Sequence, residues 1–289
     1  MTLAMTLKLM IVLSVILMLF AISLRARASD LGYLFTHWRL GLGAFAAMFV
    51  IVPAVAIAIS YIFNLDPAVE IALVAIALSP IPPILPKKQV KAGGRACYVT
   101  GLLFGATIVA ILVAPLGVYI ASRIFHFDAQ IGFMAIAMPL IVTILVPLIL
   151  GVAIAPLLSE NLLTRISGIA SKLGLILMIV ATVGLLIMIF PRMLDVIGNG
   201  ALLALALMAI VGLVAGYMLG GSDPGDRATL ALASSTRHPG VALAIAAQVF
   251  PDNQLAPAAI LLSLLVATIV CIPFMRMIGK HQRIDAAAA

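Results

Sequence analysis

The sequence predicts an all-α membrane protein with nine transmembrane helices, and three observations support this prediction. Hydrophobic residues make up 65% of the 289 residues and charged residues only 9%, whereas an ordinary soluble domain contains about 25% charged residues. The mean hydropathy is +1.30. Long apolar segments recur along the whole chain, and the connections between them leave no hydrophilic stretch large enough for a separate soluble domain.

Nine apolar segments are long enough to cross a bilayer as helices, which takes about 20 residues each. They cover residues 6–24, 40–63, 68–91, 97–121, 129–158, 172–190, 200–220, 227–250 and 255–276. A helix satisfies its own backbone polar groups, which lipid cannot do. The first segment could instead be a secretory signal peptide, since Lys8 is followed by an apolar run to Leu24 and then by the small-residue string Ala26-Arg27-Ala28. Arg25 and Arg27 stand between the apolar run and that cleavage point, which favours a retained helix.

The positions of Lys and Arg predict the orientation in the membrane, because positively charged loops are retained in the cytoplasm. If the N-terminus lies outside, only Lys8, Arg123 and Arg192 fall on that side, Arg237 lies within the membrane and all other Lys and Arg face the cytoplasm. We therefore expect a multi-pass protein of the bacterial inner (cell) membrane with a cytoplasmic C-terminus. This asymmetry explains the net charge of +7, so no nucleic-acid partner is expected.

Two of the nine segments, 68–91 and 227–250, are interrupted. The interrupting residues are Ser79, Pro80, Pro82 and Pro83 in the first segment and His238, Pro239 and Gly240 in the second. Proline lacks a backbone N–H and clashes with the preceding turn, so closely spaced prolines end a helix. The freed backbone groups need protein or water partners, which places both interruptions in the interior. Each interrupted segment is the middle one of three, in residues 40–121 and 200–276, and these units enter the membrane from opposite sides, which is the pattern of inverted repeats.

Arg237 lies near the middle of the segment 227–250, and no Asp or Glu lies near the middle of any predicted span. A charge at the bilayer centre costs about 2.5–3.5 kcal/mol on insertion scales, so it needs a partner. Helix-end carbonyls and trapped water could satisfy the guanidinium permanently, or an exchangeable anion could bind it. Arginine binds carboxylates and similar groups through two parallel hydrogen bonds, and we predict an anion site. Its expected residues are Arg237, His238, Ser234, Ser235, Thr236, Pro239 and Gly240 at one interruption and Ser79, Pro80, Pro82 and Pro83 at the other.

Other chemistry is not indicated by the sequence. It has no HExxH motif, no pair of aspartates within the predicted spans and no serine nucleophile with an evident base, so we expect no enzyme. Cys97 and Cys271 lie in different spans without a metal-binding spacing, so neither a metal nor a cofactor is expected. His238 could titrate near neutral pH and couple transport to protons, or its ring could be hydrogen-bonded to a free carbonyl.

The string from Ala231 to Leu243, with Ser-Ser-Thr-Arg-His-Pro-Gly at residues 234–240, resembles the broken-helix motif of the sodium/bile-acid symporter family. Residues 25–39 resemble the basic loop before the first core helix of that family, Pro53 its mid-helix proline, and residues 70–95 its first crossing helix. The resemblance covers essentially the whole chain, with spacing better preserved than residue identity.

This resemblance implies a fold of ten helices, divided into a core domain with two interrupted, crossing helices and a panel domain. It also implies that one N-terminal helix is absent here. We therefore expect residues 40–121 and 200–276 to form the core domain and residues 6–24 and 129–190 to form the panel domain. The substrate would pass at the crossing and in the crevice between core and panel.

The resemblance implies a secondary transporter, but the family's sodium-binding residues are missing. Sodium-coupled members use a Glu in the second broken helix, polar amides after it and a Ser-Asn pair at the first break, whereas this chain has Ala233, Arg237 with His238, and a proline-rich segment at 79–87. A nearby guanidinium also repels sodium. We therefore predict a transporter that moves a small organic anion across the lipid bilayer without sodium. Two alternatives remain: a sodium-coupled organic-anion symporter of the bile-acid type, and a non-transporting membrane sensor or binding module.

Overall fold

The computed structural model describes residues 3–125, 132–251 and 253–288, and these residues form helices and no β-strand, as predicted. Seven helices of the described chain are long and apolar enough to cross a membrane. Five of them are single α-helices: α1 (Leu3–Ser23), α8 (Ala96–Phe125), α11 (Glu160–Val196), α12 (Ala201–Leu219) and α15 (Ala256–Ala288). The other two are composed of α4 (Trp38–Phe45), η1 (Ala46–Ile51) and α5 (Val52–Ile62), and of α9 (Phe133–Leu140), η2 (Ile141–Leu145), α10 (Val146–Ile154) and η3 (Ala155–Leu157). Two short helices, α2 (Ala28–Leu31) and α3 (Tyr33–Thr36), connect α1 to α4.

Both composite helices widen into a π-helical turn just before a proline. At the end of η1 the Val52 N–H bonds to the Ala47 oxygen, five residues earlier. The next donor in this series would be Pro53, which has no N–H. The carbonyl of Met48 is therefore left without that backbone donor. The same arrangement recurs in η2, which stands before Pro147.

The two interrupted segments each form a pair of short helices. These are α6 (Pro67–Ala77) with α7 (Leu85–Lys91), and α13 (Pro224–Ser235) with α14 (Pro239–Val249). α6, α13 and α14 each begin with a proline that follows a capping residue. Proline suits this first position because its missing N–H would have no partner there. The caps accept backbone N–H groups through the side chains of Asp66, Asp223 and His238.

The two interruptions touch each other in the interior. Residues 79–83 are buried, and the His238 N–H donates a hydrogen bond of 3.0 Å to the carbonyl oxygen of Pro80. The predicted interior position of both interruptions is therefore confirmed. The count of nine spans, the inverted-repeat symmetry and the division into core and panel domains stay predictions.

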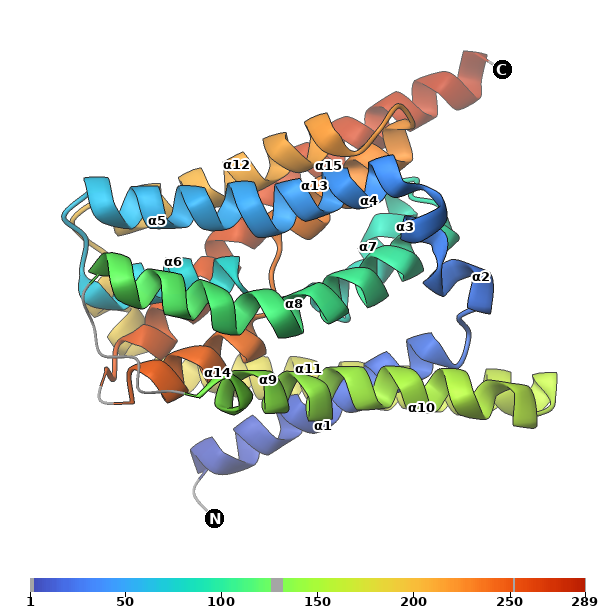
Figure 1. The fold of residues 1–289 in the computed structure, drawn as a ribbon, viewed down its shortest axis with the longest axis horizontal. Helices are drawn as coiled ribbons and strands as arrows, with labels where there is room; N and C mark the ends of the chain where they lie inside the picture. The colour runs from blue at the N-terminus through green and yellow to red at the C-terminus, as the bar shows by residue number, and fades with distance from the viewer. Residues whose placement is uncertain (1–2, 126–131, 252, 289) are drawn as a thin grey trace.

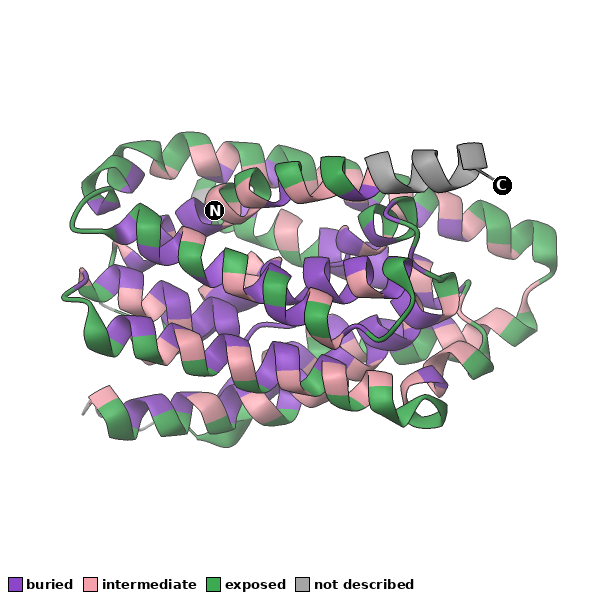
Figure 2. Ribbon diagram, turned by 90° about the horizontal axis from the view of Figure 1, so that it is seen from above, coloured by how far each residue is buried: buried purple, intermediate pink, exposed green. Residues whose placement is uncertain are grey.

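Figure 1 shows α1, α9, α10 and α11 along one side of the bundle and α4, α5 and α12 along the other, with α6 and α8 between them. Buried residues concentrate in the middle of the bundle (Figure 2). α12 and α13 approach each other closely through glycines: a Cβ at Gly212 would come within 2.7 Å of the Ser234 oxygen, and one at Gly216 within 2.5 Å of the Leu230 oxygen. Small residues four apart allow such backbone contact between membrane helices.

A polar cluster ties the start of α8 to the start of α13. Arg95 forms an ion pair with Asp226, which is buried, and its Nε donates to the Asp226 Oδ1 at 3.2 Å. The hydrogen bond to Asp226 raises the pKa of Arg95 above its ordinary value. Beside this pair, the Gln89 amide donates to the carbonyl oxygen of Thr229 at 2.9 Å. The cluster fixes the segment after α7 against α13.

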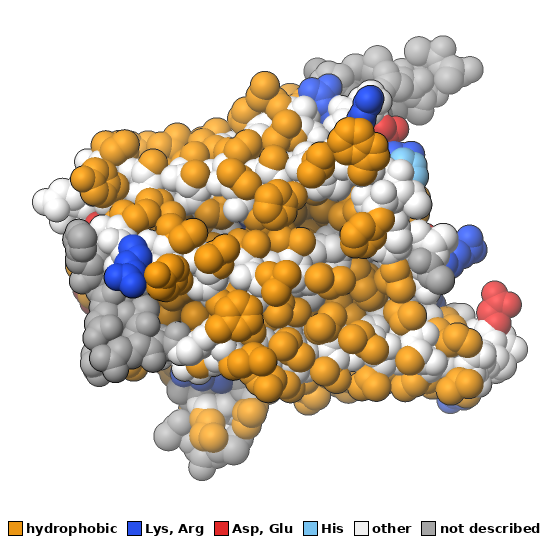
Figure 3. Space-filling view, in the orientation of Figure 1, with side chains coloured by type: hydrophobic (Ala, Val, Ile, Leu, Met, Phe, Trp, Pro, Cys, Tyr) orange, Lys and Arg blue, Asp and Glu red, His pale blue; other side chains and the backbone are white. Residues whose placement is uncertain are grey.

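Hydrophobic side chains cover most of the face shown in Figure 3, and Lys and Arg side chains gather toward its ends. Together with the seven apolar helices, this surface is that of an integral, multi-pass membrane protein. The orientation of the termini and the identity of the membrane stay predictions.

Candidate functional site

Arg237 is buried where the two interruptions meet, with 4% of its surface exposed. Its Nη1 donates a hydrogen bond of 3.2 Å to the carbonyl oxygen of Ser79, and its Nη2 donates to the carbonyl oxygen of Met48. The guanidinium carbon lies 5.5 Å from the centre of the Phe49 ring, which is within the range of a cation–π contact. One side chain therefore links η1 to the segment that follows α6.

Prolines explain why both carbonyls are free to accept these bonds. Pro53 cannot donate to Met48, and Pro83 stands four residues after Ser79 and cannot donate to it. The end of α6 also carries partial negative charge from its unpaired carbonyls. The guanidinium of Arg237 supplies the missing N–H donors and places its positive charge beside a negative helix end.

The charge of Arg237 has no acidic partner among the described residues, whose one ion pair joins Arg95 to Asp226. The Nε–H of Arg237 has no acceptor. Arg237, Ser235 and Thr236 border a void of about 10 Å³, which has room for about one water molecule. The contacts of Arg237 match the alternative in which backbone carbonyls satisfy its guanidinium permanently. Direct contact between Arg237 and a substrate stays a prediction.

His238 is buried and acts as the N-cap of α14. Its Nδ1 accepts a hydrogen bond of 3.3 Å from the Val241 N–H. An accepting Nδ1 leaves the proton of the neutral ring on Nε2, and this Nε2 is buried without an acceptor. The partner is thus a backbone N–H and not the free carbonyl considered from the sequence, because the first N–H groups of a helix also lack partners.

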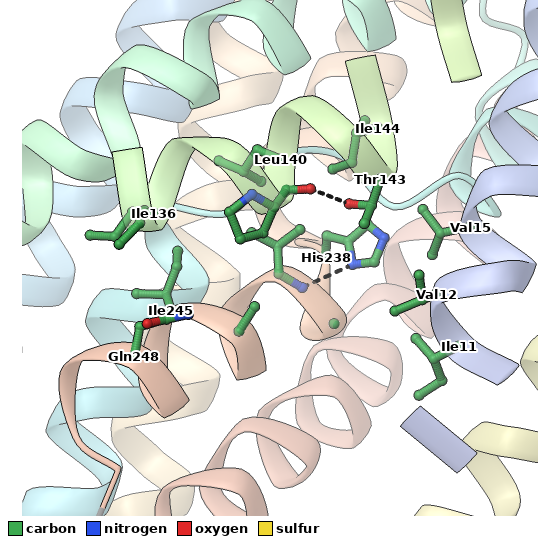
Figure 4. Close-up of a pocket in the computed structure, with 15 residues that line it drawn as sticks. Ile11, Val12, Val15, Ile136, Leu140, Thr143, Ile144, His238, Ile245 and Gln248 are labelled. Carbon is green, nitrogen blue, oxygen red and sulfur yellow. Dashed lines mark hydrogen bonds between the residues drawn. The ribbon is translucent and has the colours of Figure 1, made fainter. Parts of the chain in front are cut away.

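The His238 ring borders a cavity of about 130 Å³ between α14 and the helices α1, α9 and η2 (Figure 4). Its walls are mostly apolar, and the polar side chains that line it are His238, Thr143 and Gln248. The Thr143 hydroxyl donates to the carbonyl oxygen of Pro139 at 2.6 Å. The cavity therefore offers apolar walls and the ring of His238, whose unpartnered Nε2–H is itself covered, beside the N-terminal end of α14. That combination suits an amphipathic ligand with an acceptor group.

The sequence model of the Sodium Bile acid symporter family matches residues 12–192, which is more than half of the chain. The chain belongs to this family. No curated protein matches it. Members of the Sodium Bile acid symporter family are transporters and not enzymes, which agrees with the predicted class. The matched range contains the first interruption and ends before α12, so Arg237 and His238 lie outside it.

In this member of the Sodium Bile acid symporter family, the predicted hydroxyl groups surround the crossing without reaching the cavity of Figure 4. The Ser79 hydroxyl donates to the carbonyl oxygen of Ala75, near the end of α6, at 2.7 Å. The hydroxyls of Ser235 and Thr236 lie 3.6 and 3.7 Å from the sulfur of Cys271. The Ser234 hydroxyl is buried without a partner.

The predicted prolines and glycine take different places at the crossing. Pro80, Pro82 and Pro83 are buried in the first interruption, and Pro239 borders the small void beside Arg237. Gly240 lines the cavity, where a Cβ would come within 3.0 Å of the His238 ring. Of the predicted site residues, only His238 and Gly240 line the 130 Å³ cavity.

Sequence reasoning missed four residues that matter in this symporter-family fold. They are Met48, Glu70, Thr143 and Gln248. The position of Met48, five residues before Pro53, was a usable signal, because a π turn there frees that carbonyl. The other three are recognised only by the cavities that they line. The described residues contain no group of three or more His, Cys, Asp or Glu side chains that could hold a metal ion.

Proposed function

We propose that this chain is a secondary transporter that moves a small organic anion across the membrane without sodium. Membership of the Sodium Bile acid symporter family supports transport of a small solute through a bilayer. The chemistry of the two interruptions supports the finer parts of the proposal, namely the negative charge of the substrate and the absence of sodium coupling.

The contact of Arg237 with Ser79 and Met48 is the observation that carries the proposal. A sodium ion at the crossing would need carbonyl oxygens of this kind, and the guanidinium already occupies two of them. Two unit charges about 4 Å apart repel each other by about 4 kcal/mol at an effective dielectric constant of about 20. That repulsion lowers sodium affinity roughly a thousandfold. The fixed positive charge of Arg237 thus takes the place of a coupling sodium ion.

The cavity beside His238 is the proposed place of the anion. Its Nε2–H has no partner, and the N-terminal end of α14 favours negative charge by about 0.3–1 kcal/mol. A hydrogen bond to a charged group contributes about 1.5–3 kcal/mol. The adjacent Arg237 adds positive charge to this part of the interior without touching the cavity. Alternating access would come from movement of α14 and the crossing past α1, α9 and η2.

Uptake into proteoliposomes in sodium-free medium tests the proposal. The panel should include taurocholate, 2-oxoisocaproate and 1-pentanesulfonate, which share an anionic group on an apolar body. We expect uptake of at least one of them, and a loss of about tenfold or more in apparent affinity for His238→Ala. Thr143→Val is the matched control, because its hydroxyl lines the same cavity but already bonds to Pro139. Uptake that requires sodium would support the symport alternative, and binding without uptake would support a sensor.

A further inference from the structure

A second cavity lies on another side of α14. It has a volume of about 260 Å³ and is bordered by α6, α8, α14 and the segment that follows α14. By this measure one water molecule needs about 10–15 Å³, so the cavity has room for several. The described residues that line it are apolar apart from Glu70 and Asn253. The Asn253 side-chain oxygen already accepts hydrogen bonds from the amides of Leu255 and Ala256, at the start of α15.

Glu70 is a half-buried carboxylate in the first turn of α6. Among the described residues no donor lies within hydrogen-bonding distance of its side chain, unlike the buried Asp226, which is paired with Arg95. In the part of the chain that the structure describes, no Lys, Arg or His lines its cavity. A carboxylate that faces water in an apolar cavity can bind and release a proton without breaking a bond to a protein donor.

The charged and titratable groups on the elements that pack against Glu70 are few in the described chain. α6 contributes Asp66, whose carboxylate caps the helix. α8 contributes Arg123, whose guanidinium lies against the Tyr119 ring and hydroxyl, and α5 contributes Tyr61, which is exposed.

The remaining elements bring no charge to this cavity. α12 contributes Tyr217, stacked under Arg227. α15 contributes Cys271, beside Ser235, and Arg276, and neither lines the cavity. α14 contributes His238 at its opposite end, where a proton on Nδ1 would displace the Val241 cap. Glu70 is therefore the better proton acceptor of the two groups that flank α14.

The cavities of Glu70 and His238 share one lining residue, Ile245 of α14. On α14 the Glu70 cavity is lined by Ile245, Ala246 and Val249, which lie about two to three turns from His238. At about 1.5 Å per residue along a helix about 10 Å wide, a carboxylate at Glu70 and an anion at His238 are roughly 15–20 Å apart. Two negative charges about 17 Å apart, at an effective dielectric constant of about 20, weaken anion binding about fivefold. A proton on Glu70 removes that penalty.

We propose that Glu70 holds the proton that is coupled to anion binding, so that one proton and one anion enter together. This inference rests on the proposed transport of an organic anion and names its coupling ion. The proton adds to a carboxylate oxygen of Glu70 and leaves from the same oxygen, and no other bond changes. A monovalent anion and its proton together carry no net charge.

Calorimetry of 1-pentanesulfonate binding to the purified protein tests this inference. The sulfonate stays ionised from about pH 5 to about pH 9, and buffers of different ionisation enthalpy reveal proton uptake. We expect uptake of about 0.4 proton per sulfonate at pH values between the pKa of Glu70 in the free protein and its higher pKa in the complex, none far above that range, and an affinity that falls about fivefold from acidic to alkaline pH. Glu70→Gln, which mimics the protonated acid, should bind with the tighter affinity at every pH and take up no proton. Glu160→Gln, on the exposed start of α11, is the matched control and should behave like the parent.

Binding by the parent without proton uptake would overturn the inference and leave the proposed anion transport intact. Proton uptake that persists in Glu70→Gln, or that disappears in His238→Gln instead, would also overturn it. No sulfonate binding at any pH would contradict the anion-binding proposal together with this one. If Glu70→Gln does not fold, as size-exclusion chromatography would show, the proton uptake of the parent decides alone.

Discussion

The guanidinium of Arg237 donates a hydrogen bond to the carbonyl oxygen of Met48, 189 residues earlier in the chain. Pro53 leaves that carbonyl without its backbone donor, and Pro83 does the same for the Ser79 carbonyl that Arg237 also contacts. The structural roles of Pro53, Pro83 and Arg237 therefore depend on one another. The guanidinium of Arg237 binds the two carbonyl oxygens that Pro53 and Pro83 leave without a backbone donor.

Replacing Arg237 should destabilise the fold as well as alter transport. Arg237→Ala leaves two buried carbonyls unsatisfied, and each unsatisfied group costs about 1–3 kcal/mol. We expect a fall in melting temperature of several degrees in detergent, measured by intrinsic fluorescence. Arg192→Ala, an exposed arginine near the end of α11, should leave the melting temperature unchanged. Equal melting temperatures for Arg237→Ala and the parent would show that the two contacts contribute nothing.

Pro53→Ala should make Arg237 less necessary. Alanine restores an N–H that can donate to the Met48 carbonyl, so Arg237→Ala should cost about 1 kcal/mol less in the Pro53→Ala background. A double-mutant cycle of chemical unfolding measures this coupling. Additive effects of the two substitutions would contradict the role assigned to the Met48 carbonyl.

The ion pair between Arg95 and Asp226 should respond unequally to the loss of each partner. Asp226 has 1% of its side chain exposed and Arg95 has 47%. Arg95→Gln leaves a buried carboxylate unpaired, and breaking a buried pair in this way costs about 3–5 kcal/mol. Asp226→Asn leaves a cation that water can reach, and should cost about 1 kcal/mol. Thermal unfolding that ranks Asp226→Asn as the worse variant would show that burial does not control this pair.

Glycine at residue 216 should be required for the packing of α12 against α13. A Cβ there would come within 2.5 Å of the Leu230 carbonyl oxygen, whereas a Cβ at Gly168 would meet nothing within 4 Å. Gly216→Ala should therefore lower the melting temperature. Gly168→Ala should leave it unchanged or raise it slightly, because alanine is favoured over glycine in a helix by about 0.5–1 kcal/mol. Equal melting temperatures for Gly216→Ala and Gly168→Ala would contradict the requirement for glycine at residue 216.

Local chemistry explains which features were predictable from the sequence. The interruptions at Pro80 and Pro239 follow from proline itself, so their positions and their burial were accessible without a structure. The burial of Arg237 followed from the apolar residues around it. Its partners did not, because Met48 becomes available only when η1 widens and packs beside the crossing.

Side-chain directions were beyond the sequence for a different reason. Arg237 and His238 are neighbours, and the sequence placed both in one anion site. In the structure Arg237 lies against η1 and Phe49, while His238 borders the cavity with α1 and α9. Extended backbone between two helices sends adjacent side chains to opposite sides. Glu70 was missed because its cavity exists only after α6, α8 and α14 are packed.

The absence of sodium coupling is tested most directly by the initial rate of organic-anion uptake into proteoliposomes. The rate should be measured with an inward sodium gradient and with an equal gradient of choline, at the same membrane potential and pH, for the first anion of the panel that is transported. The fixed guanidinium of Arg237 predicts equal rates in the two gradients. A rate several-fold higher in sodium would contradict the account, because sodium would then bind despite the charge that occupies the crossing.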